Sequence, residues 1–248
     1  MIDVLSFFQS GTHSDKTTQH GYHRIYPWFL NHFRGIKNLN LLEIGVADNG
    51  SVKLWSKYFD NPNITVIDIV EKDVGDASFV LLDQSDEKML LQYALRNEAN
   101  FDIIIDDGSH VPAHQFVSLI HLWKTLKPGG VYIVEDIETS FWGKSEIYGY
   151  KFDSNKFNFV EKIIGSVQNV NSEFIQHKKN KVKTKIDALV EDAEIVSFAY
   201  NSIIFVKKNN KFNSYYNRPY RLSWKINNRS LFKRVRSKLL GILTSRLK

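Results

Sequence analysis

The chain alternates short apolar runs with longer segments whose apolar residues recur every three or four positions. A run that is apolar on both faces predicts a strand buried inside a sheet, and a one-sided stripe predicts a helix packed on that sheet. The predicted strands are residues 38–46, 64–70, 78–83, 101–106 and 129–136. The predicted helices are residues 50–59, 87–98 and 112–126. Strands that alternate with helices indicate a parallel sheet covered on both faces.

Two more strand-like runs, residues 194–200 and 202–208, follow a less regular region. Their connection is so short that the two strands must be antiparallel. Upstream, the "KPGG" at 127–130 is expected to end a helix and turn the chain into the next strand. The pattern therefore predicts an α/β fold, a Rossmann-like doubly wound sheet of seven mostly parallel strands with a C-terminal antiparallel hairpin.

Composition narrows the class of protein. The chain has 248 residues, of which 43% are hydrophobic, enough for one sizeable domain with a core. It has no Cys, which excludes disulfides, thiolate metal sites and cysteine nucleophiles. No basic start precedes an apolar run, and no window reaches the roughly 18 apolar residues of a membrane span. These features predict a soluble, cytoplasmic protein.

Basic residues gather at the end of the chain. Residues 207–248 contain 13 Lys and Arg and no Asp or Glu, which leaves 20 basic and 27 acidic residues in 1–206, a net charge of −7. In residues 228–248 the apolar and basic positions separate on a helical pattern, as in helices that lie on anionic membranes. The tail is therefore predicted to hold the protein at the inner face of the plasma membrane. A helix that packs on the chain itself or on a second subunit is the alternative.

The first predicted strand ends in "EIGVADNGS", where a ligand of an open α/β sheet would bind. Gly45 and Gly50 would let the backbone pass close to a ligand, and Glu43 would orient the turn or bind an ammonium group. The spacing is not G-x-G-x-x-G, and Asp48 adds negative charge where phosphates would sit. This disfavours a nicotinamide dehydrogenase.

Acidic residues also end the second and third predicted strands. Asp68 is placed to accept hydrogen bonds from ribose hydroxyls, and Asp83 with Gln84 to meet an adenine edge. Each residue alone fits a turn or a helix N-cap equally well. Their order on successive strands favours a nucleoside ligand.

Two acidic pairs close the fourth and fifth predicted strands, in "FDIIIDDGSH" and "GGVYIVEDIE". Asp106, Asp107, Glu135 and Asp136 would repel one another at one sheet edge unless a cation neutralised them. Oxygen ligands suit Mg²⁺ or another hard divalent ion. Because side chains alternate along a strand, not all four bind it, and Asp107 is preferred over Asp106. A simple turn and a helix cap are the structural alternative.

His110 follows Asp107 by three residues. Its imidazole can face a hydroxyl held at the metal and accept the proton of that hydroxyl. A surface or capping role is the alternative, and it is the role expected for His114 and His121.

This succession of motifs resembles the class I S-adenosylmethionine-dependent methyltransferases over about residues 38–208, between an N-terminal segment (1–37) and the basic tail (209–248). The resemblance implies that Glu43 and Gly45 hold the methionine moiety, Asp68 the ribose and Asp83 the adenine. The cofactor-binding residues expected in all are Glu43, Gly45, Ser51, Asp68, Asp83, Gln84, Asp106 and Tyr22.

The segments "DDGSH…VEDIETSFW", "GTHSDK…HGY" and "LLEIGVADNGSVKLW" together are similar to the metal-dependent macrolide-sugar O-methyltransferases of the mycinamicin and tylosin type, and to their bacterial glycan relatives. The resemblance implies that Asp107, Glu135 and Asp136 hold Mg²⁺, that His110 is the general base, and that the acceptor is a sugar or glycan hydroxyl. Acceptor specificity is expected in Thr139 to Trp142 and in the irregular residues 143–180.

The N-terminal segment of that group helps to close the site. Its candidates here are Asp15, Lys16, His20, Tyr22 and Tyr26, although a solvated loop explains Asp15 and Lys16 equally well. Two other functions stay open at this stage. A nucleic-acid methyltransferase is disfavoured because the cleft is acidic and the positive charge is confined to the tail. A non-catalytic binding module would have little use for clustered acids. A homo-oligomer is compatible with the sequence.

Overall fold

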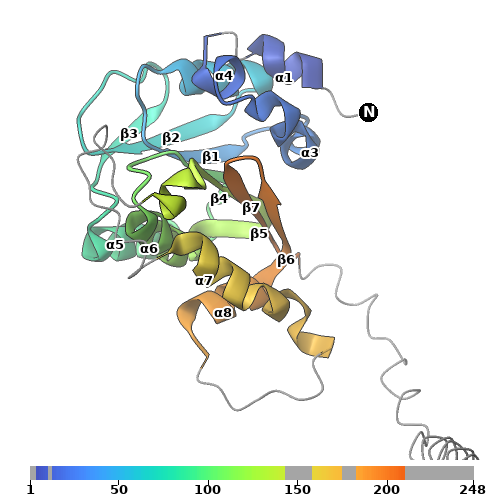
Figure 1. The fold of residues 1–248 in the computed structure, drawn as a ribbon. Helices are drawn as coiled ribbons and strands as arrows, with labels where there is room; N and C mark the ends of the chain where they lie inside the picture. Colours follow the sequence, from blue (N-terminus) through green and yellow to red (C-terminus); the bar gives the residue numbers. More distant parts are fainter. Residues whose placement is uncertain (1–3, 11–12, 143–157, 175–182, 210–248) are drawn as a thin grey trace, which may run out of the picture. The chain divides into compact units, whose positions relative to one another are not determined.

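The computed structural model describes residues 4–10, 13–142, 158–174 and 183–209. These residues contain a seven-stranded sheet with the order β3-β2-β1-β4-β5-β7-β6 (Figure 1). The strands are β1 (Asn40–Ile44), β2 (Asn63–Asp68), β3 (Ser78–Leu81), β4 (Phe101–Asp106), β5 (Leu126–Glu135), β6 (Ala193–Ala199) and β7 (Ser202–Lys207). The first five are parallel, and β7 pairs antiparallel with both β5 and β6. The predicted fold class is confirmed.

Helices cover both faces of the sheet (Figure 1). Successive residues of each strand point to opposite faces, so Ile103 and Ile105 join one apolar cluster and Ile104 joins the other. The first cluster packs against α1 (Val4–Ser10), η1 (Tyr22–Arg24), α3 (Tyr26–Leu30) and α4 (Gly50–Tyr58). The second packs against α5 (Glu87–Arg96), α6 (Pro112–Leu122), α7 (Phe159–Ser166) and α8 (Lys185–Asp192).

The N-terminal segment is part of the core. Its rings form a stack in which Tyr22 lies 5.1 Å from Tyr26 and Tyr26 lies 6.3 Å from Trp55, centroid to centroid. Both tyrosines are fully buried. The helix α2 (Asp15–Thr18) precedes this stack, and Ser14 caps its N-terminus. The segment is therefore fixed against the face of the sheet that α4 covers.

Strand β5 begins earlier than the "KPGG" motif predicts. The helix α6 ends at Leu122, a 3-10 turn follows, and β5 starts at Leu126. Phe101 pairs with Leu126 whereas Ile103 pairs with Val131, so residues 127–130 form an irregularity in the ladder instead of a turn before it. Gly129 makes this possible because its φ is +82°.

Three neighbouring strands place the site. β1, β4 and β5 lie side by side and end at Ile44, Asp106 and Glu135, so the segments that follow them meet at one edge of the sheet. The hairpin between β6 and β7 returns to this edge because Ser202 pairs with Glu135. Within the described ranges, no helix is long and apolar enough to cross a membrane. The predicted membrane-binding tail lies outside the described residues.

Candidate active site

The turn after β1 is held by contacts with the chain itself. Gly45 has a φ of +85° and donates its N–H to the Ile67 carbonyl at 2.8 Å. A Cβ at this position would overlap the Asp107 carbonyl oxygen and lie 2.8 Å from the Gly108 Cα. Close approach of a ligand was the expected reason for Gly45, but the turn requires glycine because the β4 loop packs directly on it.

A Gly45→Ala substitution is therefore expected to lower the free energy of unfolding by about 2–4 kcal/mol, through left-handed strain and steric overlap together. Denaturant unfolding measures this. Gly75→Ala is the matched control, because Gly75 has a φ of +64° and a Cβ added there would meet nothing within 4 Å. It should lose only about 1 kcal/mol. Equal losses in the two variants would contradict the packing explanation.

The carboxylates at the three strand ends converge on one ammonium group. Lys16 Nζ lies 2.6 Å from Asp107 Oδ2, 2.8 Å from Glu135 Oε2 and 3.5 Å from Glu43 Oε1. The Lys16 side chain is only 1% exposed, so the solvated-loop alternative is wrong for this residue. Asp15 is exposed, as that alternative expects, but it lies in the helix α2 and not in a loop.

Burial and charge act against each other in this cluster. Burial disfavours the Lys16 ammonium, but the carboxylates of Asp107, Glu135 and Glu43 outweigh it and raise the pKa of Lys16 above its ordinary value. Burial raises the pKa of Glu43 to about 7, although Lys16 acts in the opposite direction. Three acids thus share one fixed positive charge.

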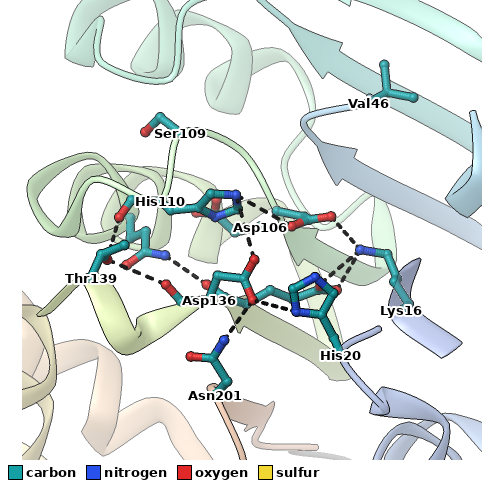
Figure 2. Close-up of polar contacts among 12 residues, drawn as sticks. Lys16, His20, Val46, Asp106, Ser109, His110, Asp136, Thr139 and Asn201 are labelled. Carbon is teal, nitrogen blue, oxygen red and sulfur yellow. Dashed lines mark hydrogen bonds and ion pairs between the residues drawn. The ribbon is translucent and has the colours of Figure 1, made fainter. Parts of the chain in front are cut away.

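A second group of side chains adjoins this cluster at Asp107. One ligand atom each from Asp107, His110 and Asp136 lies within 4.8 Å of the others. His110 Nε2 is 3.9 Å from Asp107 Oδ1 and 3.8 Å from Asp136 Oδ2 (Figure 2). The Thr139 hydroxyl donates to the His110 carbonyl at 2.6 Å and so links this loop to the segment after β5. Glu135 belongs to the Lys16 cluster.

Asp136 has one carboxylate oxygen fixed by other parts of the chain. Its Oδ1 accepts a hydrogen bond from the Tyr22 hydroxyl at 2.8 Å. The same oxygen accepts from the Asn201 amide at 2.9 Å, and His20 Nδ1 lies 3.4 Å away (Figure 2). Burial raises the pKa of Tyr22, and the negative charges of Glu135 and Asp136 raise it further. The phenol therefore stays protonated and acts as the hydrogen-bond donor. The other oxygen, Oδ2, is turned toward His110.

Asp106 points away from this group, as the alternation of side chains predicts. It is fully buried and accepts hydrogen bonds from Gln84 Nε2 at 2.5 Å and the Tyr132 hydroxyl at 3.4 Å. Gln84 also accepts from the Ser109 N–H at 2.9 Å, which holds the loop before His110. Burial raises the pKa of Asp106 to about 7. Asp106 and Gln84, predicted to bind the cofactor, bind each other in this structure.

This pKa predicts a pH dependence of stability. Asp106 keeps its proton up to about pH 7 in the folded protein, whereas in the unfolded chain it loses the proton near pH 4. As pH rises between these two values, the free energy of unfolding should therefore fall by up to about 1.4 kcal/mol per pH unit. Asp106→Asn removes this contribution. The stability advantage of the wild type over this variant should therefore fall between about pH 5 and pH 7 in urea unfolding. A difference that is constant or grows with pH would refute the expectation.

The remaining predicted cofactor residues lie along the same edge. Asp68 Oδ2 accepts from the Val46 N–H at 2.9 Å, which joins the end of β2 to the Gly45 turn, and Lys72 Nζ is 3.2 Å away. Asp83 is exposed and accepts from the Ser85 N–H in a tight turn. The Ser51 hydroxyl donates to Glu43 at 2.8 Å.

Two residues of the site were not identified from the sequence. Asn201 lies in the tight connection of the hairpin, for which its φ of +50° is suitable, and its amide reaches Asp136. Gln115 on α6 is fully buried and donates to the Glu135 carbonyl at 2.8 Å. Neither residue has a local signal, because the hairpin and the helix meet the β5 end only through the topology of the sheet. His114, expected to be a capping or surface residue, is half-buried and hydrogen-bonds Ser109.

Comparison with known proteins agrees with this architecture. No model of a known protein family matches the chain. A crystal structure of the methyltransferase MycE of the mycinamycin pathway, in complex with Mg and SAH, superimposes with a TM-score of 0.69 at 24% identity, over 84% of this chain and 54% of that one. The fold is that of class I S-adenosylmethionine-dependent methyltransferases. The terminal antiparallel hairpin beside β5 completes the methyltransferase sheet.

Curated relatives are similar over a shorter region. The chain is 36% identical over 132 residues to a mycinamicin VI 2''-O-methyltransferase of Micromonospora griseorubida, which is 48% of this chain and 33% of that protein. It is 36% identical over 139 residues to an 8-demethyl-8-alpha-L-rhamnosyl tetracenomycin-C 2'-O-methyltransferase of Streptomyces olivaceus, 52% of this chain and 36% of that protein. The match thus spans about one third of the length of these relatives, and the predicted resemblance to macrolide-sugar O-methyltransferases is confirmed.

Proposed function

We propose that this methyltransferase fold transfers a methyl group from S-adenosylmethionine to a sugar hydroxyl of a glycosylated natural product, with a divalent cation at the ends of β4 and β5. The observation that carries the proposal is the group of Asp107, His110 and Asp136, which combines hard oxygen donors with a base beside the Gly45 turn. The relatives that are named for O-methylation of such compounds support the choice of acceptor.

The donor set fits a hard cation. Ligand atoms on opposite sides of Mg²⁺ are roughly 4.2 Å apart, and those of Asp107, His110 and Asp136 lie within 4.8 Å. Asp107 would contribute Oδ1 and Asp136 Oδ2, because the second oxygen of each already accepts hydrogen bonds. Glu135, which the family resemblance implies as a third ligand, would join only by sharing its carboxylate with Lys16.

The edge beside this group fits the cofactor. The Gly45 turn and Asp68 are joined through the Val46 N–H, so the turn proposed for the methionine moiety and the acid proposed for the ribose form one unit. Asp83 and Gln84 follow at the next strand end and would lie near the adenine. Glu43 and Ser51 line the buried side of the turn.

The proposed mechanism assigns the chain three tasks. When bound, S-adenosylmethionine supplies the methyl group, and Mg²⁺ lowers the pKa of the acceptor hydroxyl. Asp107 and Asp136 orient that hydroxyl, and His110 Nε2 accepts its proton. The Thr139 hydroxyl holds the His110 backbone in place, so the imidazole stays directed between the two carboxylates.

Exposed aromatic rings next to the site are suited to the acceptor. Phe141 is 66% exposed in the turn that follows Asp136, so core packing does not account for it. Trp142 is half-buried beside it. Aromatic faces pack on the apolar faces of sugar rings, and we assign this part of η4 (Ile137–Phe141) to the acceptor.

The test is methyl transfer by the full chain. Rhamnosylated macrolides and polyketides, nucleotide sugars, and RNA are each incubated with S-adenosylmethionine, with Mg²⁺ or with a chelator, and methylated products are detected by mass spectrometry. The proposal expects a methylated glycoside only with the divalent ion. Methylation of RNA, or equal turnover with chelator, would refute it.

A further inference from the structure

Lys16 is a buried cation next to a proposed cation site. A lysine is almost never fully buried without a charge partner, and this one has three, each from the end of a different strand. The hydrogen bonds at 2.6–2.9 Å to Asp107 and Glu135 make it a close ionic contact. The clustered acids were expected to need a metal ion because their charges must be neutralised. The Lys16 ammonium group already provides part of that neutralisation.

Asp107 is shared between the two groups. Its Oδ2 accepts the hydrogen bond from Lys16, and its Oδ1 is the atom nearest His110. Lys16 and His110 thus contact different oxygens of the same carboxylate. An ion bound between Asp107 and Asp136 would therefore interact with the same carboxylate as the Lys16 ammonium group. The two positive charges would lie only a few ångströms apart.

The position of Lys16 is fixed by its helix. The Ser14 side chain caps α2 by accepting from the Lys16 N–H, and the Thr17 hydroxyl donates to the Ser14 carbonyl at 2.9 Å. The backbone before it packs on α4, since a Cβ at Gly50 would lie 2.9 Å from the His13 carbonyl oxygen. The ammonium group is therefore built into the site and is not an exposed side chain that happens to reach it.

We infer that Lys16 is the internal counter-ion of the metal site: it holds Asp107 and Glu135 together when no metal is bound, and it weakens the binding of divalent cations. This inference rests on the proposed function. Lys16 acts through Asp107 and is a positioning residue. Its ammonium keeps the acids from repelling one another, so the site is formed before the ion arrives. The like charge of the ammonium then makes ion binding reversible.

The test uses Lys16→Met, which keeps the length of the side chain and removes its charge. Mn²⁺ binding is measured by electron paramagnetic resonance of the unbound ion. We expect the variant to bind Mn²⁺ at least about tenfold more tightly than the wild type. The melting temperature should depend on the ion as well: the variant should melt lower than the wild type in chelator and recover with Mg²⁺, whereas the wild type changes little. A loss of packing alone would not tighten ion binding.

Two further variants keep the test decisive. If Lys16→Met by itself does not fold, the double variant Lys16→Met with Glu135→Gln replaces it, because it removes one positive and one negative charge together. The double variant should bind Mn²⁺ more tightly than Glu135→Gln alone. Lys88→Met, at an exposed position on α5, is the control for loss of one positive charge and should not change Mn²⁺ affinity.

The outcomes separate this inference from the proposed function. Mn²⁺ binding to the wild type, with equal or weaker binding to the folded Lys16 variants, would overturn the inference and leave the metal site standing. Absence of Mn²⁺ binding to every protein tested, wild type included, would overturn the proposed metal site and the inference with it.

Discussion

Replacing Asp136 with Asn is expected to lower Mn²⁺ affinity by at least about 100-fold and to reduce methyl transfer in proportion, with little effect on folding. The variant has the shape of the native residue. The Tyr22 hydroxyl and the Asn201 amide both donate to Oδ1, so they would hold the amide oxygen of the new side chain in that place. Its NH₂ group would then occupy the position of Oδ2, facing His110, where the ion requires an oxygen.

The measurements are Mn²⁺ titration, calorimetric titration of S-adenosylhomocysteine, and the methyl-transfer assay. S-adenosylhomocysteine should bind the variant and the wild type with equal affinity, because Asp68 and the Gly45 turn are unchanged. Glu161→Gln, at an exposed position on α7, is the matched carboxylate-to-amide control and should behave as the wild type. Unchanged Mn²⁺ affinity in Asp136→Asn would exclude Asp136 as a ligand.

The order of strands and helices follows from local patterns and was predictable. Strands apolar on both faces must be buried on both faces, and a doubly wound sheet offers that arrangement to alternating strands and helices. The alternation of side chains separates Asp106, the last residue of β4, from Asp107, which follows it. The irregular start of β5 was missed because Pro and paired Gly suit a turn and a bulge equally well, and the pairing partner decides between them.

The composition of the site was predictable only where acids follow strands. Asp107 and Asp136 follow the last residues of strands that are recognisable in the sequence, and parallel strands bring the residues after them to one edge of the sheet. Lys16 and Asn201 reach the same place from segments distant in sequence, 91 residues before Asp107 and 65 residues after Asp136. Contacts of that kind depend on how whole elements pack, and the residue types themselves fit a solvated loop and a hairpin turn.

His110 provides the second large expected effect. It sits in the loop after β4 with a φ of +55°, a conformation that most residues avoid and that Asn tolerates. His110→Asn therefore removes the imidazole without straining the backbone, and the Thr139 hydrogen bond to the carbonyl of residue 110 can persist. If His110 takes the proton of the acceptor hydroxyl, methyl transfer should fall by about 10²- to 10⁴-fold.

The same variant separates a base from a metal ligand, because His110 Nε2 lies at nearly equal distances from Asp107 and Asp136 and its geometry suits both roles. If His110 is a base, His110→Asn should still bind Mn²⁺ and S-adenosylhomocysteine, and added imidazole should restore part of the activity by replacing the missing ring. If His110 is a metal ligand, the same variant should bind Mn²⁺ roughly 10- to 100-fold more weakly, or worse. Loss of Mn²⁺ affinity in His110→Asn, with no recovery in imidazole, would make His110 a ligand and require another residue to accept the proton.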